Sequence, residues 1–174
     1  MRQKTLKVEL NKHYYSGVEQ PGVLVGPITR RSHGSNPAPA IFQMQTFLPY
    51  PNIKKSIRVL DNKRLGKQRV ETHQILNLLL KRTNKKGWKN HPVIKMWKGY
   101  SNFLKLYFNE SLKEWIKRGY KNNMKFEKIN GKILMPKWFG NKKFHASHRS
   151  NLLRKDKKYY SKFKWKEKEN MPYV

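Results

Sequence analysis

The chain has 174 residues, enough for one domain with a hydrophobic core and too few for two large ones. Its 40 Lys and Arg residues against 10 Asp and Glu residues give a formal net charge of +30, which favours a polyanionic partner, with nucleic acid first. The absence of cysteine excludes disulfides and thiolate metal sites, and no apolar run reaches the length of a membrane span. Without a secretory signal, we expect an intracellular protein, cytoplasmic or associated with the nucleoid, that binds no membrane.

Residues 1–43 differ in composition from the rest of the chain. They have irregularly spaced Gly and Pro, no amphipathic period, and only six of the 40 basic residues. Short strings can be back-translated into parts of a methionine tRNA gene: a D arm (residues 18–22), an anticodon stem and loop (25–30) and a T arm (34–37). We therefore predict a leader encoded by a translated tRNA gene over residues 1–43, with a disordered leader as the alternative. The functional domain is predicted over residues 44–174.

The domain from Met44 onward is expected to start with an extended segment and a long helix. Pro49 and Pro51 each bias the preceding residue away from helical geometry, so residues 44–51 are predicted to be extended or to form a turn. A helix is predicted from about Asp61 to Arg82, because Asp61 can cap its start and leucine and isoleucine residues recur on one face. A polar connection then reaches Pro92.

A second long helix is predicted from Val93 to Gly119, where apolar residues recur at three- and four-residue steps. Glycine is a common stop signal, and one break is expected near Gly99 or Asn109. The remaining segments are residues 121–136, irregular or a small hairpin, and 145–163, a third, shorter helix. The prediction is an all-α, compact single domain of about three main helices with an irregular N-terminal leader.

Glu71 is the only acidic residue between Asp61 and Glu110. It lies in a basic stretch with Lys63, Arg64, Lys67 and Arg69. A single carboxylate among cations suits an enzyme that acts on a polyanion, because the cations hold phosphates while the carboxylate moves protons or stabilises developing positive charge. The alternative is a surface carboxylate that forms helix ion pairs.

Histidines and loop aromatics are further candidates for nucleic-acid contacts. His145 and His148 are spaced to share a helix face with Arg149 nearby, and no acidic residue lies within seven positions to complete a metal site. We expect no metal and no cofactor. The loop aromatics Trp88, Trp138 and Phe139 are candidates for base stacking, with packing on the core as the alternative. The predicted nucleic-acid contacts are Lys63, Arg64, Lys67, Arg69, His91, His145, His148, Arg149, Arg154 and Lys155.

The stretch LDNKRLGKQRVE (residues 60–71) resembles the phage-type pyrimidine-dimer DNA glycosylases, also called endonuclease V, and the small bacterial and viral proteins grouped with them. The resemblance continues in residues 90–120, which are similar to the second long helix of that family, and in the tyrosine-rich string KKYYSKF (157–163). It covers most of residues 44–163 through short identities.

This resemblance implies double-stranded DNA as substrate, a monomeric all-helical enzyme, and glycosylase activity coupled to AP-lyase activity. In the family an N-terminal α-amine attacks C1′ of the damaged nucleotide and forms an imine, and a glutamate assists; Glu71 matches that glutamate. The family amine belongs to a threonine exposed by methionine removal. Here Met44 is followed by Gln45 and Thr46 comes third, so the amine belongs to Met44, or to Gln45 after methionine removal, and Thr46 remains a candidate catalytic residue.

Two other classes of function stay open on the residues alone. One is a non-enzymatic nucleic-acid-binding protein of the same fold, in which Glu71 only pairs with neighbouring cations. The other is a metal-dependent nuclease, which predicts that a chelator abolishes cleavage, whereas an imine mechanism needs no metal.

Overall fold

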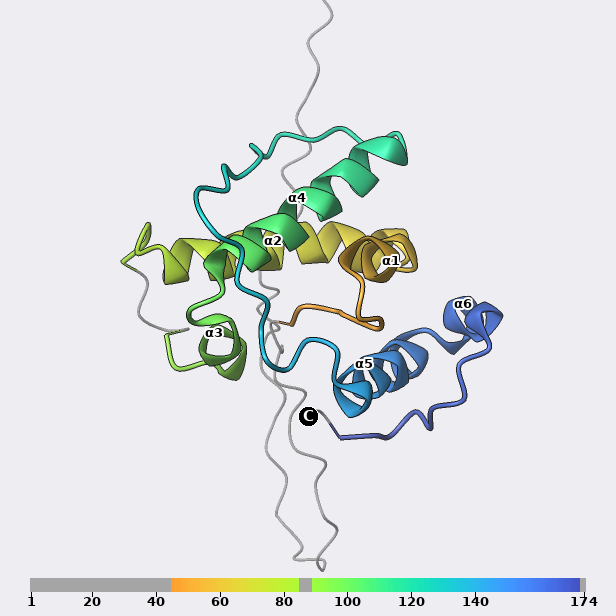
Figure 1. Ribbon diagram of the computed structural model, residues 1–174. Coiled ribbons are helices and arrows are strands. Elements are labelled where there is room, and N and C mark those ends of the chain that lie inside the picture. The colour runs from red at the N-terminus through yellow and green to blue at the C-terminus, as the bar shows by residue number, and fades with distance from the viewer. Residues whose placement is uncertain (1–44, 85–88, 173–174) are drawn as a thin grey trace, which may run out of the picture. The chain divides into compact units, whose positions relative to one another are not determined.

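The computed structural model describes residues 45–84 and 89–172 (Figure 1). The predictions for the leader at residues 1–43, for Met44 and for Trp88 lie outside the described residues. Within them the fold is all-α, as predicted, and no strand occurs in the described part of the chain. Its helices are α1 (Ile53–Arg58), α2 (Asn62–Leu79), α3 (Pro92–Trp97), α4 (Ser101–Lys117), α5 (Lys142–Lys155) and α6 (Lys157–Tyr160), followed by a 3₁₀ turn (Ser161–Phe163).

The long helices α2, α4 and α5 match the three predicted ones. The short helices α3 and α6 are separate parts of the predicted second and third helices, and α1 is an addition. The predicted break in the second helix occurs at Gly99, whose φ of 87° ends α3 before α4 begins. The sequence did not predict α1. In this short helix Asn52 caps the start by accepting a hydrogen bond from the Lys55 amide at 2.8 Å. Its buried Ile53 and Ile57 lie one turn apart, which is too short a repeat to indicate a helix.

Helix α4 ends at Lys117, and the predicted stop at Gly119 follows it in a Schellman motif. The Gly119 amide donates to Ile116 O at 2.9 Å, and the Tyr120 amide donates to Trp115 O at 3.3 Å. Gly119 has a φ of 83°, a conformation that glycine adopts without a Cβ penalty. This turn reverses the chain into the segment between α4 and α5.

The segment at residues 121–141 is irregular, which settles the alternative between an irregular stretch and a hairpin. Its residues run back along α4: the Glu127 amide donates to Asn109 Oδ1, Lys105 Nζ donates to Lys128 O, and Asn102 Nδ2 donates to Asn130 O. Figure 1 shows this segment passing α2 and α4 before it enters α5. The segment is therefore held by side chains of α4 rather than by a strand partner.

The core lies where α2 and α4 pack together and where residues 46–48 pass between helices. Fully buried side chains from both long helices meet there, among them Leu65, Ile75 and Leu76 of α2 and Leu104 and Phe108 of α4. Residues 45–48 have no regular secondary structure and residues 49–51 bend, which agrees with the predicted extended or turn segment, and Thr46, Phe47 and Leu48 are buried. An extended segment inside a helical core has no strand partner, so helix side chains must satisfy its backbone.

Candidate active site around Glu71

Helix α2 positions Glu71 and its neighbours on one stripe. Asp61 caps the helix by accepting a hydrogen bond from the Arg64 amide at 3.0 Å, which sets where the helix begins. Arg64, Lys67, Gln68 and Glu71 then follow at three- and four-residue steps, so their side chains lie along the same side. Glu71 is only 8% exposed, so it is not a surface carboxylate, although it forms the predicted kind of helix ion pair with Lys67.

Gln68 joins Glu71 to the extended segment. Its Nε2 donates to Glu71 Oε2 at 3.1 Å and to Gln45 O at 2.7 Å, while its Oε1 accepts from the Phe47 amide at 2.8 Å. The side chain of Gln68 is fully buried. Residues 45–47 are therefore fixed beside the Glu71 carboxylate through one amide group.

Tyr107 of α4 holds Gln68 from the other side. Its hydroxyl lies 2.6 Å from Gln68 Oε1 and 3.0 Å from Phe47 O, and the two acceptors share its one proton. Burial, followed by the nearby charge of Glu71, raises the pKa of Tyr107 well above its ordinary value, so the hydroxyl remains a donor. Sequence reasoning flagged neither Gln68 nor Tyr107, although Gln68 stands one helical turn before Glu71.

The environment of Glu71 favours a carboxyl that can accept and release a proton. Burial raises the pKa of Glu71, and this effect outweighs the charge of Lys67 and a backbone hydrogen bond from Gln45, both of which lower it. Lys67 Nζ lies 3.5 Å from Glu71 Oε1, and Lys155 adds a further favourable charge interaction. General acid–base groups work best when their pKa is shifted toward the working pH.

Arg64 brings the end of α5 to this site. Its guanidinium donates to Lys155 O at 2.7 Å and forms ion pairs at 3.3 Å with Asp61 and with Asp156. Lys155, predicted from a distant part of the sequence, is thereby placed within electrostatic range of Lys67 and Glu71. Four predicted residues, Glu71, Arg64, Lys67 and Lys155, therefore gather at one place.

Thr46, predicted as a candidate catalytic residue, is fully buried, and its hydroxyl accepts a hydrogen bond from Trp97 Nε1 at 3.0 Å. The residue described next to the carboxylate is Gln45, which interacts with Glu71 through its backbone and with Gln68 through its carbonyl. Met44 precedes Gln45 in the chain but lies outside the described residues.

Two predicted cationic contacts are engaged within the fold. The Arg69 guanidinium lies over the Trp115 ring at 3.9 Å and donates to Asn122 Oδ1 at 3.2 Å. Arg149 donates to Pro49 O at 2.7 Å and pairs with Glu167 at 2.6 Å, so it ties the start of the described chain to its end. These contacts stabilise the fold, and neither guanidinium belongs to the group around Glu71.

The predicted histidines occupy structural positions. His145 Nδ1 donates to Leu48 O at 2.7 Å and its Nε2 accepts from the Gly140 amide at 3.0 Å, an arrangement that requires the neutral ring. His148 packs against Phe144 and Phe47 with ring centroids 4.4 and 6.4 Å apart, and burial lowers the pKa of His148 to about 3. His91 caps α3 by accepting from the Val93 amide at 3.2 Å. His145 and His148 lie on one face of α5, as predicted, but this face is buried against the core.

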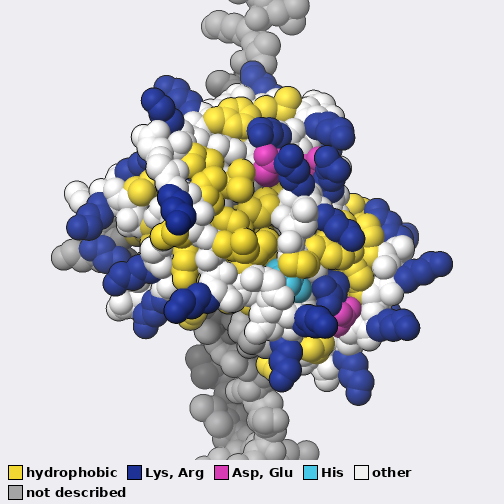
Figure 2. Space-filling model, viewed as in Figure 1, with side chains coloured by type: hydrophobic (Ala, Val, Ile, Leu, Met, Phe, Trp, Pro, Cys, Tyr) yellow, Lys and Arg dark blue, Asp and Glu magenta, His cyan; other side chains and the backbone are white. Residues whose placement is uncertain are grey.

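Lys63 and Arg154 are exposed and form no ion pair with another described residue. Lysine and arginine side chains cover much of the face seen in Figure 2, around a central hydrophobic area. The described loop aromatics pack on the core, which was the alternative to base stacking. Trp138 packs on Trp97 and Phe139 on Phe103, with ring centroids 5.0 and 4.9 Å apart.

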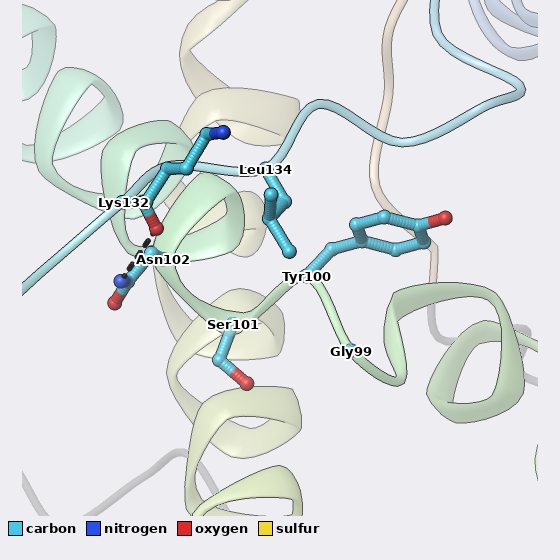
Figure 3. Close-up of a pocket in the computed structure, with 6 residues that line it drawn as sticks. All are labelled: Gly99, Tyr100, Ser101, Asn102, Lys132 and Leu134. Carbon is cyan, nitrogen blue, oxygen red and sulfur yellow. Dashed lines mark hydrogen bonds between the residues drawn. The ribbon is translucent and has the colours of Figure 1, made fainter.

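A pocket of about 280 Å³ lies at the start of α4, away from this group of residues (Figure 3). Asn102 donates to Lys132 O across one side of it, and none of its lining residues carries a carboxylate. The lining residues are Gly99, Tyr100, Ser101, Asn102, Lys132 and Leu134. This pocket therefore offers no carboxylate, and the Glu71 group remains the candidate active site.

Within residues 45–84 and 89–172, no helix is both long and apolar enough to cross a bilayer. The same described ranges contain no group of three or more His, Asp or Glu residues that could hold a metal ion.

Comparison with known proteins identifies the family. The family model described as pyrimidine dimer DNA glycosylase matches residues 44–128, and through this segment the chain belongs to that family. Its substrate class is therefore DNA, and its broad role is DNA repair. Comparison with curated proteins and with solved structures gave no match. The matched segment contains Gln45, Gln68, Glu71 and Tyr107, whereas Lys155 lies beyond it.

Proposed function

We propose that the protein is a DNA glycosylase with AP-lyase activity that acts on pyrimidine-dimer lesions in double-stranded DNA, with Glu71 as its catalytic carboxylate. The observation that carries this proposal is the placement of Glu71: a buried carboxyl with a raised pKa, beside Gln45 and bordered by Lys67 and Lys155. A carboxyl so placed can protonate a departing base and stabilise the cationic sugar that forms.

The proposed nucleophile is an amine that attacks C1′ of the damaged nucleotide. The C1′–N bond to the base breaks as the base leaves with a proton. The C1′–O4′ bond of the sugar ring then opens, O4′ takes up a proton, and loss of the amine proton gives an imine between the amine nitrogen and C1′. Removal of a C2′ proton then expels the 3′ phosphate, and water releases the enzyme. An α-amine suits this role because its pKa of about 7.7–8.0 leaves a neutral fraction at physiological pH. In a chain that starts at Met44 this amine lies next to Gln45, and Thr46 then serves only to fix the segment.

Cations around Glu71 are proposed to hold the DNA backbone. Lys63, Lys67, Arg154 and Lys155 are exposed, and phosphate contacts of this kind set position and orientation rather than sequence preference. Arg64 contributes mainly by joining α2 to α5. The net charge of +30 makes affinity strongly dependent on salt. We propose a monomer that works in the cytoplasm or on the nucleoid.

The test is incision of a duplex that carries one cyclobutane thymine dimer, beside the undamaged duplex, in the presence of EDTA. The proposal predicts that one glycosidic bond and the strand are cleaved only at the dimer, with the detached base still joined to its neighbour through the cyclobutane ring. Cleavage persists in EDTA because the imine mechanism needs no metal. Binding without cleavage of either duplex favours the alternative, a non-enzymatic DNA-binding protein. Cleavage that disappears with EDTA indicates a metal-dependent nuclease and contradicts the proposal.

A further inference from the structure

Tyr107 begins a buried chain of hydrogen bonds that ends at Glu71. Its hydroxyl donates to Gln68 Oε1 at 2.6 Å, and Gln68 Nε2 donates to Glu71 Oε2 at 3.1 Å. Tyr107 and Gln68 are both fully buried, where hydrogen bonds are electrostatically stronger than in water. The chain therefore crosses from α4 to α2 and reaches the carboxylate through a single amide group.

The orientation of the Gln68 amide is fixed by its partners on both sides. Oε1 accepts from the Tyr107 hydroxyl and from the Phe47 amide at 2.8 Å, while Nε2 donates to Gln45 O at 2.7 Å and to Glu71. In the reverse orientation Nε2 would face the Phe47 N–H, and Oε1 would face the oxygen atoms of Gln45 and Glu71. Gln68 thus presents a donor to Glu71, and a donor favours the ionised carboxylate.

The Tyr107 hydroxyl holds this amide in place and strengthens its donor. Two donors on Oε1 polarise the amide, which makes the Nε2–H at its other end a stronger donor. The Tyr107 ring is itself fixed, because it packs in the core beside Trp97 with ring centroids 6.5 Å apart. Loss of the hydroxyl removes one of the two donors to Gln68 Oε1 and the 3.0 Å donor to Phe47 O, so the amide loses part of its support.

We propose that Tyr107 is a positioning residue for the reaction, which acts through Gln68 to hold an amide donor on the Glu71 carboxylate. This inference rests on the proposed function, in which Glu71 is the catalytic carboxylate. Burial raises the pKa of Glu71, and the Gln68 donor opposes this effect together with Lys67 of α2 and Lys155 of α5. Tyr107 therefore helps to set the pH at which Glu71 changes from proton donor to proton acceptor.

The experiment is a carbon-13 NMR titration of Glu71 in the full 174-residue chain, labelled at the side-chain carboxyl carbon of glutamate. The signal that disappears in Glu71→Gln assigns the resonance. In Tyr107→Phe, which keeps the ring and removes the hydroxyl, we expect the pKa of Glu71 to rise by about half a pH unit or more, because the carboxylate loses part of its donor. Tyr107 stays protonated throughout, since burial raises its pKa well above the ordinary value of 10.0. Tyr120→Phe, the same change on an exposed residue, is the matched control and should leave the pKa of Glu71 unchanged.

Two further measurements separate this role from a merely structural one. Single-turnover cleavage of an abasic-site duplex by Tyr107→Phe should fall at least about fivefold with Kd unchanged, because the carboxylate is less well placed. In Gln68→Leu the chain is already interrupted, so the addition of Tyr107→Phe should not move the pKa of Glu71 further. An equal rise in the wild-type and Gln68→Leu backgrounds would overturn the inference, since Tyr107 would then not act through Gln68.

The outcomes keep this inference apart from the proposed function. An unchanged pKa of Glu71 in folded Tyr107→Phe, beside a wild type that cleaves dimer-containing DNA, overturns the role of Tyr107 and leaves the proposed function standing. A wild type that cleaves neither dimer-containing nor abasic DNA overturns the proposed function and, with it, the role of Tyr107 in the reaction. The titration reads Glu71 without DNA, so the two failures are seen in separate measurements.

Discussion

Replacement of Gln68 by leucine tests whether the hydrogen bonds of the Gln68 side chain hold residues 45–47 beside Glu71. Leucine fits the volume of the buried side chain but leaves the Phe47 amide without its 2.8 Å acceptor and Gln45 O without its 2.7 Å donor. The buried amide carries the full cost of an unpaired group, about 1–3 kcal/mol, and the half-buried carbonyl of Gln45 adds about 1 kcal/mol, so we expect a loss of about 2–4 kcal/mol.

The assay is urea denaturation followed by circular dichroism, beside abasic-site cleavage and DNA affinity. Gln74→Leu is the matched control, because Gln74 is exposed on the same helix; its stability should stay within about 0.5 kcal/mol of the wild type. Gln68→Leu should also lose cleavage rate while it retains DNA affinity, since no phosphate-binding cation is changed. If Gln68→Leu and Gln74→Leu have equal stability, the Gln68 side chain does not hold residues 45–47 and the reasoning is refuted.

Glu71→Gln should become more stable than the wild type as pH rises. A carboxyl with a raised pKa in the folded state contributes its full stabilisation below its ordinary pKa of 4.5, and this stabilisation is lost as pH rises through the folded-state pKa. The melting temperatures of the two proteins should therefore differ at pH 7 and converge near pH 4. Equal melting temperatures at both pH values would contradict the raised pKa. Arg64→Ala should cost about 1–3 kcal/mol in urea denaturation, because it removes the hydrogen bond and the ion pair that join α2 to the end of α5. Gly119→Ala should cost about 1 kcal/mol through its positive φ, and an unchanged melting temperature would argue against the Schellman turn.

The sequence predicted those parts of the fold that depend on local signals. Asp61 as a cap and the leucine period located α2, and the glycine at position 119 located the end of α4. Glu71 was found because it is the only acid in a basic stretch, a feature visible without any structure. Lys67, four residues before it, had to share its side of the helix.

The rest of the site depends on contacts that join distant parts of the chain. Nothing in a mid-helix glutamine indicates that an extended segment runs beside it, so the role of Gln68 could not be predicted. The spacing of His145 and His148 correctly places both on one face, but spacing does not tell a buried face from an exposed one when the residues are polar. The proximity of Lys155 to Glu71 depends on how α5 returns to α2 through Arg64.

The central claim is that Glu71 performs catalysis and does not merely pair with cations. The most direct measurement is single-turnover cleavage of an abasic-site duplex by the wild type and by Glu71→Gln, with DNA affinity measured on the same samples. We predict a loss of at least about 100-fold in the cleavage rate, typical for removal of a general acid–base group, with unchanged Kd. Undiminished cleavage by Glu71→Gln, with the variant folded and bound to DNA, would contradict the assignment of Glu71 as the catalytic carboxylate.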